Sequence, residues 1–590
     1  MIDSPTPFDR EIIITEAEQA FCNGAFLGWL SEKPIYGGDQ ENEVFLKVLV
    51  ELHNTKAIDL LNPINTDQLR DISREDFWQL QHLYCSLIPE LEARADHLMD
   101  AVERLVDKAG NDLAANRPNS AFRDWLILRP KETKRLLERA QKNPEGKLRL
   151  LTFILEAGAM LNLSEYQAAA TGFLDSQHLE NRLSGVTALG RIDSSTNEEC
   201  HSKSLLALRA HAETANSDHE FAQTVGVLLD VYARYPGVDE DRVIGTIQSA
   251  SKRPTPDLHF LLARSLGYNH DKFSNDLQKT IIDTLRFADL SMNGVIDQID
   301  FAFSRCLNKE NRRAIADCLQ DLLDRSEGSL NFANLTSFIQ KLVTNHPASL
   351  NWLIVHWLRF GSHQARLSLP SLFKQFTERG YELDIALVEF EFSDEELIFI
   401  SRKALGYFVV EGATAASILI SCLKASSGQA AAEAISELLF DPLMINLSGQ
   451  ARDVIERHAK SKGKRIKHLK SALRIHDEYL VGLKVVNEIP ELWPSPSERQ
   501  VQVERQRQIF ARSFKDAEKA SVFSNLVTTQ TLLNGVGAIQ YTRDIDGQLH
   551  RSESILSSHG TSIEFPRFEF IDPVYFQHLI LQFRNEMFDQ

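Results

Sequence analysis

Three consecutive polar residues of this 590-residue sequence, His476, Asp477 and Glu478, have side chains of the types used in acid–base catalysis. Catalysis would require the three side chains to converge on one substrate. Adjacent side chains on a helix point about 100° apart, so these three do not converge without help from another segment. We therefore expect no catalytic residue here.

A second group contains histidine and cysteine, the side chains that bind zinc. Its members are Cys200, His201, His211 and His219. Their spacings do not repeat a helical turn, and the sequence has no Cys-x-x-Cys or His-Glu-x-x-His motif. The phosphate-binding motifs Gly-x-x-x-x-Gly-Lys-Ser/Thr and Gly-x-Gly-x-x-Gly are also missing, as is the hydrolase motif Gly-x-Ser-x-Gly. We expect a non-enzymatic protein that holds neither a metal nor a cofactor.

The densest local charge lies between Arg452 and Arg474, where nine basic residues face two acidic ones. Lysines in such a stretch can bind a phosphate backbone, with strong salt dependence and little sequence choice. Alternatively, some of them complement a helix end before Gly463 and the others form a solvated face. No aromatic residue interleaves the basic ones, which argues against stacking on single-stranded bases. The candidate polyanion-binding residues are Lys460, Lys462, Lys464, Arg465, Lys467, Lys470 and Arg474.

The segment from His559 to Pro573 is rich in glycine, proline, phenylalanine and charge. One hypothesis is an exposed strand edge that docks a partner, anchored by Arg567 and Phe568. The other, which we favour, is a structural clasp that seals the last hydrophobic core of the chain.

The composition is globular, with 43% apolar and 25% charged residues and a formal charge of −18. This balance favours solubility and argues against a whole surface dedicated to nucleic acid. The six cysteines form no close pair, which is typical of a reducing compartment. Residues 1–10 lack the pattern of a signal peptide, and nowhere do 18 apolar residues run together. We expect a cytoplasmic protein that makes no contact with a membrane.

Apolar residues recur at helical spacing along most of the chain, and strand-like alternation is confined to the C-terminal part. Ser73, Ser217 and Ser393 each precede an acidic residue by three positions, which predicts a helix start at each. In the same way Ser164 and Gln167 predict the start of a helix that is followed by a second one ending at Gly190. Such short amphipathic helices cannot bury their apolar stripes alone and need stacked neighbours.

The predicted fold is mainly α, an α-solenoid of stacked helical hairpins with a small C-terminal β-hairpin/α element. An Asp546–Gly547 turn between two alternating stretches predicts the hairpin. The predicted segments are an N-terminal helical cap at 1–143, the solenoid at 144–440, a basic helical pair at 441–488, a linker with charged helices at 489–534, and the β-hairpin with a terminal helix at 535–590.

The helical pair around residues 164–192 resembles the HEAT and armadillo class of helical repeats. The matching residues are Asn181–Arg182 early in the second helix and Ala188–Leu189–Gly190 at its end. The match covers about 30 residues. The resemblance implies a curved surface used for binding.

Three functional hypotheses follow from these patterns, and the third of them is an enzyme with a dispersed site around His476 or the C-terminal element. The first is a non-catalytic scaffold or adaptor that holds protein partners in a multi-protein assembly. The second is a protein that engages nucleic acid through residues 452–474, in a setting such as bacterial genome maintenance or anti-phage defence.

Overall fold

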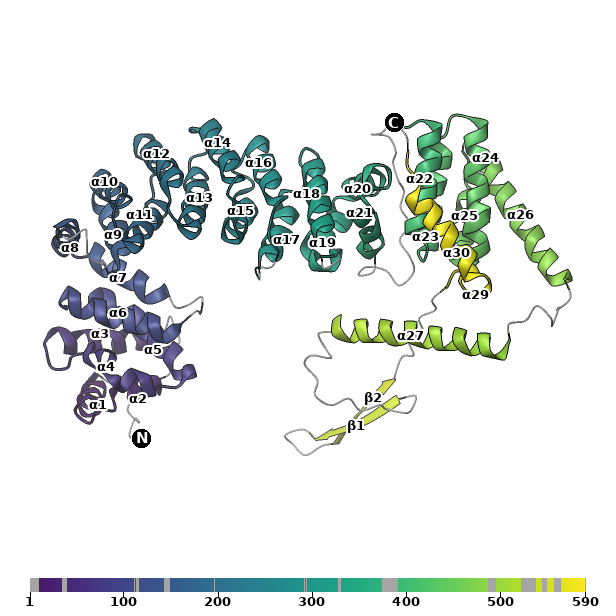
Figure 1. Cartoon of the computed structure of the whole chain (residues 1–590). Helices are drawn as coiled ribbons and strands as arrows, with labels where there is room; N and C mark the ends of the chain where they lie inside the picture. The colour runs from purple at the N-terminus through teal and green to yellow at the C-terminus, as the bar shows by residue number, and fades with distance from the viewer. Residues whose placement is uncertain are drawn as a thin grey trace. The chain divides into compact units, whose positions relative to one another are not determined.

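The protein is described by a computed structural model that covers 15 stretches of the chain (Figure 1). These are residues 10–33, 40–110, 112, 116–142, 149–195, 197–290, 292, 294–326, 330–373, 391–463, 465–486, 495–520, 537–543, 549–555 and 564–588. The described residues are mainly helical, as predicted. Their contacts divide the chain into two compact units, Met1–Cys318 and Leu319–Gln590.

The first unit is built from helices joined by short turns, where η marks short 3-10 or π-helical turns. In order they are α1 (Arg10–Cys22), α2 (Phe26–Ser31), α3 (Gln40–Asn54), α4 (Asn62–Asn65), η1 (Asp67–Asp71), α5 (Arg74–Leu87), η2 (Ile88–Glu90), α6 (Ala95–Ala109), α7 (Arg117–Ile127), α8 (Pro130–Lys142), α9 (Leu151–Leu161), α10 (Leu163–Phe173), α11 (Leu179–Arg191), α12 (Glu198–Thr214), α13 (Asp218–Tyr232), α14 (Glu240–Ala250), α15 (Pro256–Asn269), α16 (Asn275–Leu285) and α17 (Val295–Cys306).

The second unit is also helical and adds two strands near the end of the chain. Its elements are α18 (Arg312–Arg325), which crosses the boundary, η4 (Phe332–Asn334), α19 (Thr336–Asn345), α20 (Pro347–Phe360), α21 (His363–Ser368), η5 (Leu369–Leu372), α22 (Asp394–Tyr407), α23 (Gly412–Ala425), α24 (Gln429–Leu438), η7 (Leu439–Met444), α25 (Ser448–Lys460), α26 (Ile466–Val485), α27 (Pro496–Ala520), β1 (Gly537–Arg543), β2 (Leu549–Ile555), α29 (Phe568–Ile571) and α30 (Pro573–Asn585).

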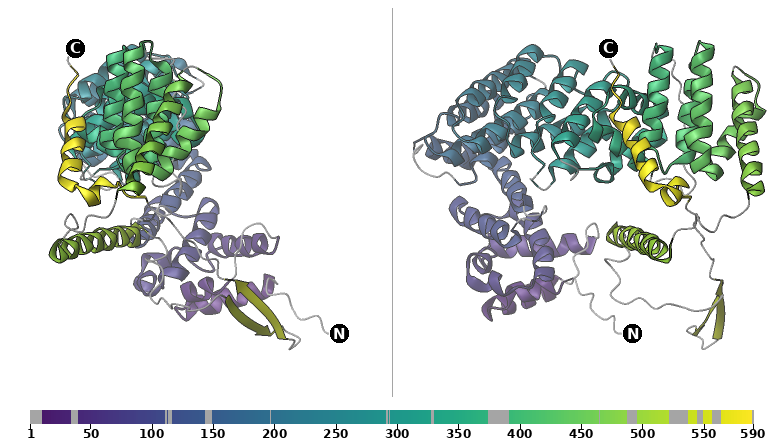
Figure 2. Two further views of the ribbon diagram at one scale, coloured as in Figure 1. Left: turned by 90° about the vertical axis from the view of Figure 1, so that its right-hand side faces the viewer. Right: turned by 45° about the vertical axis from the view of Figure 1, so that its right-hand side comes forward.

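Helices in each unit pack on the next-but-one helix of the sequence. In the first unit α9, α11, α13, α15 and α17 contact one another in turn, and α14 contacts α16. In the second, α22 contacts α24, α23 contacts α25 and α24 contacts α26, while α30 lies against α22 (Figure 2). This order is consistent with a helical solenoid-like class. The five predicted segments stay a prediction, and the stacking runs through their boundaries at 143 and 440.

Three of the four predicted helix starts are confirmed. The hydroxyls of Ser73, Ser217 and Ser393 each accept a hydrogen bond from the backbone N–H three residues later, and Ser393 forms a full capping box with Glu396. The start at Ser164 is wrong. Asn162 caps α10 instead, since its side chain accepts from the N–H of Glu165.

Gly190 has a different role from the predicted one. Helix α11 continues to Arg191, so this glycine does not end it. A Cβ atom on Gly190 would lie 2.8 Å from the side chain of Val227 on α13. Glycine is therefore needed here because two neighbouring repeats approach closely.

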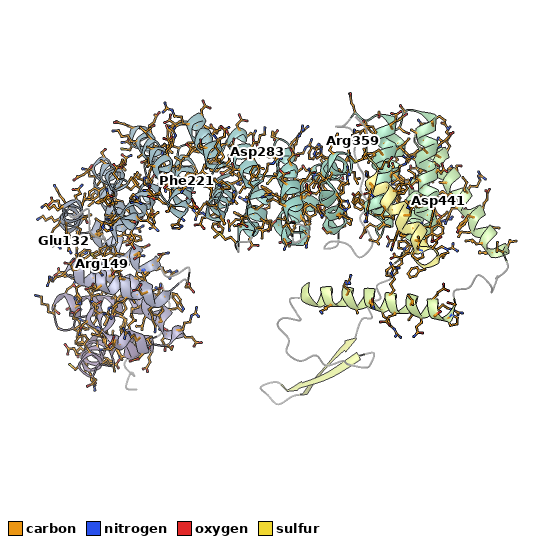
Figure 3. All side chains as sticks on the ribbon, viewed as in Figure 1. Glu132, Arg149, Phe221, Asp283, Arg359 and Asp441 are labelled. Atoms are coloured by element: carbon orange, nitrogen blue, oxygen red, sulfur yellow. The ribbon has the colours of Figure 1, made fainter. Side chains whose placement is uncertain are left out.

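Between residues 123 and 396, arginine–acid contacts between neighbouring repeats recur at a nearly constant sequence separation, whereas those nearer the N-terminus join residues 41 to 49 positions apart. Arginine and acidic side chains join residues 33 to 38 positions apart, which is the length of one helical hairpin. The pairs are Arg123–Glu156, Arg182–Glu220, Arg264–Asp230 and Arg359–Glu396. The repeat is thus visible in the contacts although the residues themselves do not repeat. Side chains fill the spaces between the helices in both units (Figure 3).

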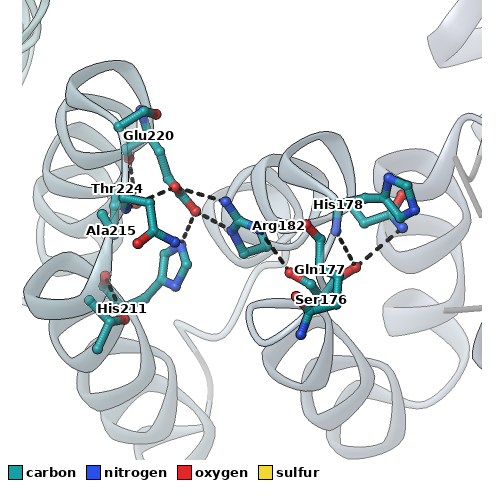
Figure 4. A network of polar contacts seen from close by, with 12 residues as sticks. Ser176, Gln177, His178, Arg182, His211, Ala215, Glu220 and Thr224 are labelled. Carbon is teal, nitrogen blue, oxygen red and sulfur yellow. Dashed lines mark hydrogen bonds and ion pairs between the residues drawn. The ribbon is translucent and has the colours of Figure 1, made fainter. Parts of the chain in front are cut away.

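The contact between Arg182 and Glu220 is the most buried of these pairs (Figure 4). The carboxylate of Glu220 is fully buried and accepts from Arg182 at 2.5 and 3.1 Å. The same guanidinium donates to the carbonyl oxygens of Ser176 and Gln177, at 2.9 and 3.1 Å. His211 lies 3.1 Å from the carboxylate. Arg182, one of the residues that resemble the HEAT class, therefore joins α11 to α13.

Burial by itself would raise the pKa of Glu220. The hydrogen bonds and the positive charge of Arg182 outweigh burial, so the pKa of this carboxyl lies below its ordinary value of 4.5. Glu220 therefore remains ionised at neutral pH, and its ionisation stabilises the folded state.

The two strands pair antiparallel, with Gly537 opposite Ile555 and Arg543 opposite Leu549. The Asp546–Gly547 turn expected between them lies outside the described residues. Packing of a small β element on the terminal helices therefore stays a prediction.

Replacing Arg182 with Met should destabilise the contact between α11 and α13. An ionised, buried Glu220 would lose its main partner, and breaking such a pair costs about 3 kcal/mol or more. Native-state hydrogen exchange should show amides of α11 and α13 opening roughly a hundredfold more often. Arg135→Met is the control, because Arg135 pairs with Glu132 on an exposed surface. Equal effects of the two substitutions would contradict the assignment.

The ionisation of Glu220 also predicts a pH dependence. Because its pKa is lowered in the folded state, its stabilisation is present above pH 4.5 and is lost as the pH falls below that value. The urea midpoint, followed by circular dichroism, should drop more between pH 7 and pH 4 in the wild type than in Glu220→Gln. A variant with the same drop as the wild type would show that other carboxyls carry the acid sensitivity.

Candidate polyanion-binding site

The predicted basic residues lie at the turn between α25 and α26. Lys460 ends α25, Lys462 lies in the turn, and Lys467 and Lys470 are in the first two turns of α26; all four side chains are exposed. Lys464 lies outside the described residues. The structure thus places most of the predicted lysines near one another, on the solvent side of the turn.

Arg465 stabilises the fold and is less available to a ligand than the lysines are. Its guanidinium donates to the carbonyl oxygens of Ser426, Ser427 and Gly428 at 2.7 to 3.1 Å. These carbonyls belong to the turn between α23 and α24. Arg465 also has a φ of 67°, in the left-handed region, directly before α26 begins. It therefore joins two consecutive helical hairpins.

Two further arginines of the basic stretch are held by acidic side chains. Arg474 pairs with Glu478 one turn later on the exposed face of α26. Arg452 pairs with Glu456 at 2.6 Å and with Asp477 at 2.7 Å. The net charge of the stretch is therefore partly neutralised by its own helices.

The three residues at His476–Glu478 each have a partner on α25 or α26. His476 is buried, and its Nδ1 lies 2.9 Å from Nη1 of Arg452. Asp477 holds the same arginine, while Glu478 holds Arg474. His476 and Asp477 thus join α26 to Arg452 of α25. Glu478 stabilises α26 itself through its pair with Arg474.

The structure adds Lys424, which sequence reasoning missed. Its Nζ lies 3.3 Å from Nδ1 of His458, so the last turn of α23 meets the last turns of α25. Lys424 and His458 are 34 residues apart, a separation within the range of the arginine–acid pairs between neighbouring repeats. This spacing could have identified Lys424 from the sequence. Lysines one period apart are expected to meet at the same end of a stack.

The residues of the predicted docking edge are hydrogen-bonded to Asn446, in the turn before α25. The backbone N–H of Arg567 donates to the carbonyl of Asn446, and that of Phe568 donates to its side-chain oxygen, at 3.1 and 2.8 Å. The guanidinium of Arg567 reaches the hydroxyl of Tyr479 at 3.3 Å. Phe568 begins the helix α29. A strand edge at Phe568 is therefore contradicted; a role for these two residues in binding a partner stays a prediction.

The clasp begins with Glu564, which caps a helix distant in sequence. Its carboxylate accepts from the N–H groups of Gly449 and Gln450 at 2.7 and 2.9 Å. These are unpaired donors of the first turn of α25, and a negative charge there is favourable.

The clasp continues with α30, which buries three apolar side chains at helical spacing, Phe576, Ile580 and Phe583. Two of them, Phe576 and Ile580, line a narrow cavity of about 20 Å³ against helices of the stack. The other lining residues are Leu405, Phe408, Val409, Pro442, Leu443, Asn446 and Leu447. The terminal helix therefore covers an apolar face that α22, η7 and the turns after them would otherwise expose.

Helices α22 and α30 cap each other's C-terminal ends. Lys403 of α22 donates to the carbonyls of Phe583, Arg584 and Glu586 at 2.6 to 2.9 Å. In return, Arg584 of α30 donates to the carbonyl of Gly406 at 2.7 Å. Burial, followed by the charge of Arg366, lowers the pKa of Lys403 to about 8. The ammonium thus keeps three N–H donors at neutral pH for its three acceptors.

The described residues contain no group of three or more side chains arranged to hold a metal ion. The histidines once considered for zinc have separate partners: His211 faces Glu220, and His219 faces Asp257. Within the described part of the chain, no helix is long and apolar enough to cross a membrane. No protein-family model matches the sequence, and a search of curated proteins finds no significant match.

Replacing Lys403 with Met should loosen the terminal helix. The variant loses a charged donor to three carbonyls, and such bonds contribute about 2 kcal/mol. Amides of α30 should then exchange roughly thirtyfold faster, because the helix detaches more often. Lys424→Met is the control, since Lys424 is exposed. Unchanged protection of α30 in Lys403→Met would show that apolar contacts alone hold the clasp.

Proposed function

We propose that this chain is a non-catalytic scaffold or adaptor subunit, which holds protein partners together in a multi-protein assembly. Its helices form a HEAT-like α-solenoid. The observation that supports this most is the recurrence of arginine–acid contacts one hairpin apart, in the first unit and again in the second. Stacked repeats of this kind expose long rows of helix faces in fixed register, and such rows serve to bind other macromolecules.

Exposed apolar side chains on separate repeats of the first unit support the proposal. Met160 on α9, Leu206 on α12 and Tyr268 on α15 are 68%, 57% and 68% exposed. Single exposed apolar residues are ordinary on a protein surface, but partners find their anchors among them. We infer that some of these side chains contact the partner.

The proposal places the protein in the cytoplasm. All six cysteines are free thiols, and four of them are buried. This usage fits a reducing compartment. Genome maintenance or anti-phage defence as the biological setting stays a hypothesis.

A tagged chain expressed in its native cell should copurify with a protein at a fixed molar ratio. The purified pair should re-form a complex of defined mass in size-exclusion chromatography with light scattering. Combining Met160→Ser, Leu206→Ser and Tyr268→Ser should weaken that complex about tenfold or more, since large apolar anchors carry most binding energy. Glu199→Ser with Lys203→Ser, an exposed ion pair on α12, is the control. A chain that always purifies alone would count against a scaffold.

A further inference from the structure

One surface of the second unit carries positive charge drawn from three helices. We call it the basic end surface. It consists of Lys424, Arg457, Lys460, Lys462, Lys467 and Lys470, all of them exposed. Lys424 comes from the last turn of α23, Arg457 and Lys460 from the last turn of α25, and the others from the turn and the start of α26. It therefore differs from the linear stretch, because it gains Lys424 and loses Arg452, Arg465 and Arg474 to structural contacts.

Helix stability explains only part of this surface. Lys424 and Lys460 lie at helix C-termini, where a positive charge is favourable. Lys467 and Lys470 lie at the start of α26, where a positive charge is unfavourable and an acid would be expected. The first turn of α26 has no acidic residue. The helix dipole thus does not account for Lys467.

Ion pairing does not neutralise the lysines of this surface either. In the described part of the chain, no carboxylate pairs with the ammonium groups of Lys460, Lys462 or Lys470. Among the residues that the structure describes, Lys467 reaches the amide oxygen of Gln429 alone, at 3.4 Å. Asp394, an acid near Arg465, accepts from the N–H groups of Ser427 and Gly428 instead. The positive charge of the lysines is therefore available to a ligand.

Large apolar anchors for a protein partner are missing among the basic residues of this surface, and the exposed apolar side chains of α26 begin at Ile475. No large apolar side chain is exposed among the described residues of 448–474. Protein interfaces depend on buried aromatic and aliphatic anchors, whereas a phosphate backbone is bound by lysine and arginine with little need for apolar contact. The total charge of −18 does not cancel this attraction, because charges separated by more than about 8 Å are screened at physiological salt.

We propose that the basic end surface binds the sugar–phosphate backbone of a nucleic acid, through Lys462, Lys467 and Lys470 with support from Lys424 and Lys460. The contact is sequence-independent, since it engages phosphates rather than base edges. It is separate from the scaffold function and does not depend on it. Arg465 positions the turn that presents these lysines and does not itself contact the ligand.

The test is fluorescence anisotropy with labelled 30-nucleotide single strands and 30-base-pair duplexes, DNA and RNA, at about 50 and about 200 mM salt. The wild type should bind at least one of them at the lower salt, with log K falling against log salt by a slope of about −3 to −4. Combining Lys462→Glu, Lys467→Glu and Lys470→Glu should lower the affinity at least a hundredfold. Binding should not depend on base sequence.

The control is the combination of Lys131→Glu, Lys134→Glu and Lys142→Glu on α8, which changes the total charge equally at three exposed lysines. It should keep the wild-type affinity within twofold. Circular dichroism with thermal unfolding verifies that both triple variants fold. If the Lys462→Glu, Lys467→Glu, Lys470→Glu variant does not fold, the single substitution Lys470→Glu replaces it and should reduce affinity about fivefold. Equal losses in the two triple variants would overturn the proposal, because bulk charge would then explain binding. So would an absence of binding at 50 mM salt, or binding of polyglutamate in place of nucleic acid, which would identify an acidic protein as the ligand.

Discussion

The fold depends on cationic side chains that donate to backbone carbonyls at helix ends and in the turns between helices. Each helix leaves its last carbonyls without an intrahelical partner, and a stack of short helices has many such ends. Arg182, Arg465 and Lys403 each supply donors to two or three carbonyls of another helix or of the turn that follows it. Lys403 thereby completes the end of α30, while Arg182 holds the turn between α10 and α11 and Arg465 holds the turn between α23 and α24.

Donation to helix-end carbonyls also explains why several cationic side chains can lie close together in the second unit. Arg366 donates to the carbonyls of Trp357 and Arg359 at the end of α20, while Arg584 and Lys403 serve the ends of α22 and α30. The negative ends of three helix dipoles thus offset cations that would otherwise repel one another. Such a cluster is structural, whereas the lysines of the basic end surface have no comparable acceptors in the described residues. Both groups of residues are positively charged. What distinguishes the structural group from the lysines of the basic end surface is that its members have backbone carbonyls to donate to.

Local features of the fold could be predicted from the sequence, and distant contacts could not. The caps at Ser73, Ser217 and Ser393 were predictable because the hydroxyl and its donor are three residues apart. The cap at Ser164 was wrong because Asn162, two residues earlier, competes for the same helix start. Lys462, Lys467 and Lys470 were identified from charge density alone. The role of Arg465 was not, since its acceptors lie 37 to 39 residues away and nothing in its own segment marks them.

The clasp formed by residues 564–588 has a consequence for how the protein is made. Lys403 and Gly406 receive their partners only from residues about 180 positions later. At a synthesis rate of 5–20 residues per second, the ribosome needs roughly 10–40 s to deliver them. Once η7 has been made, the apolar face that it forms with α22 stays uncovered until α30 arrives, which is the condition under which nascent chains attract chaperones or aggregate. Translation speed between these two points therefore bears directly on the yield of folded protein.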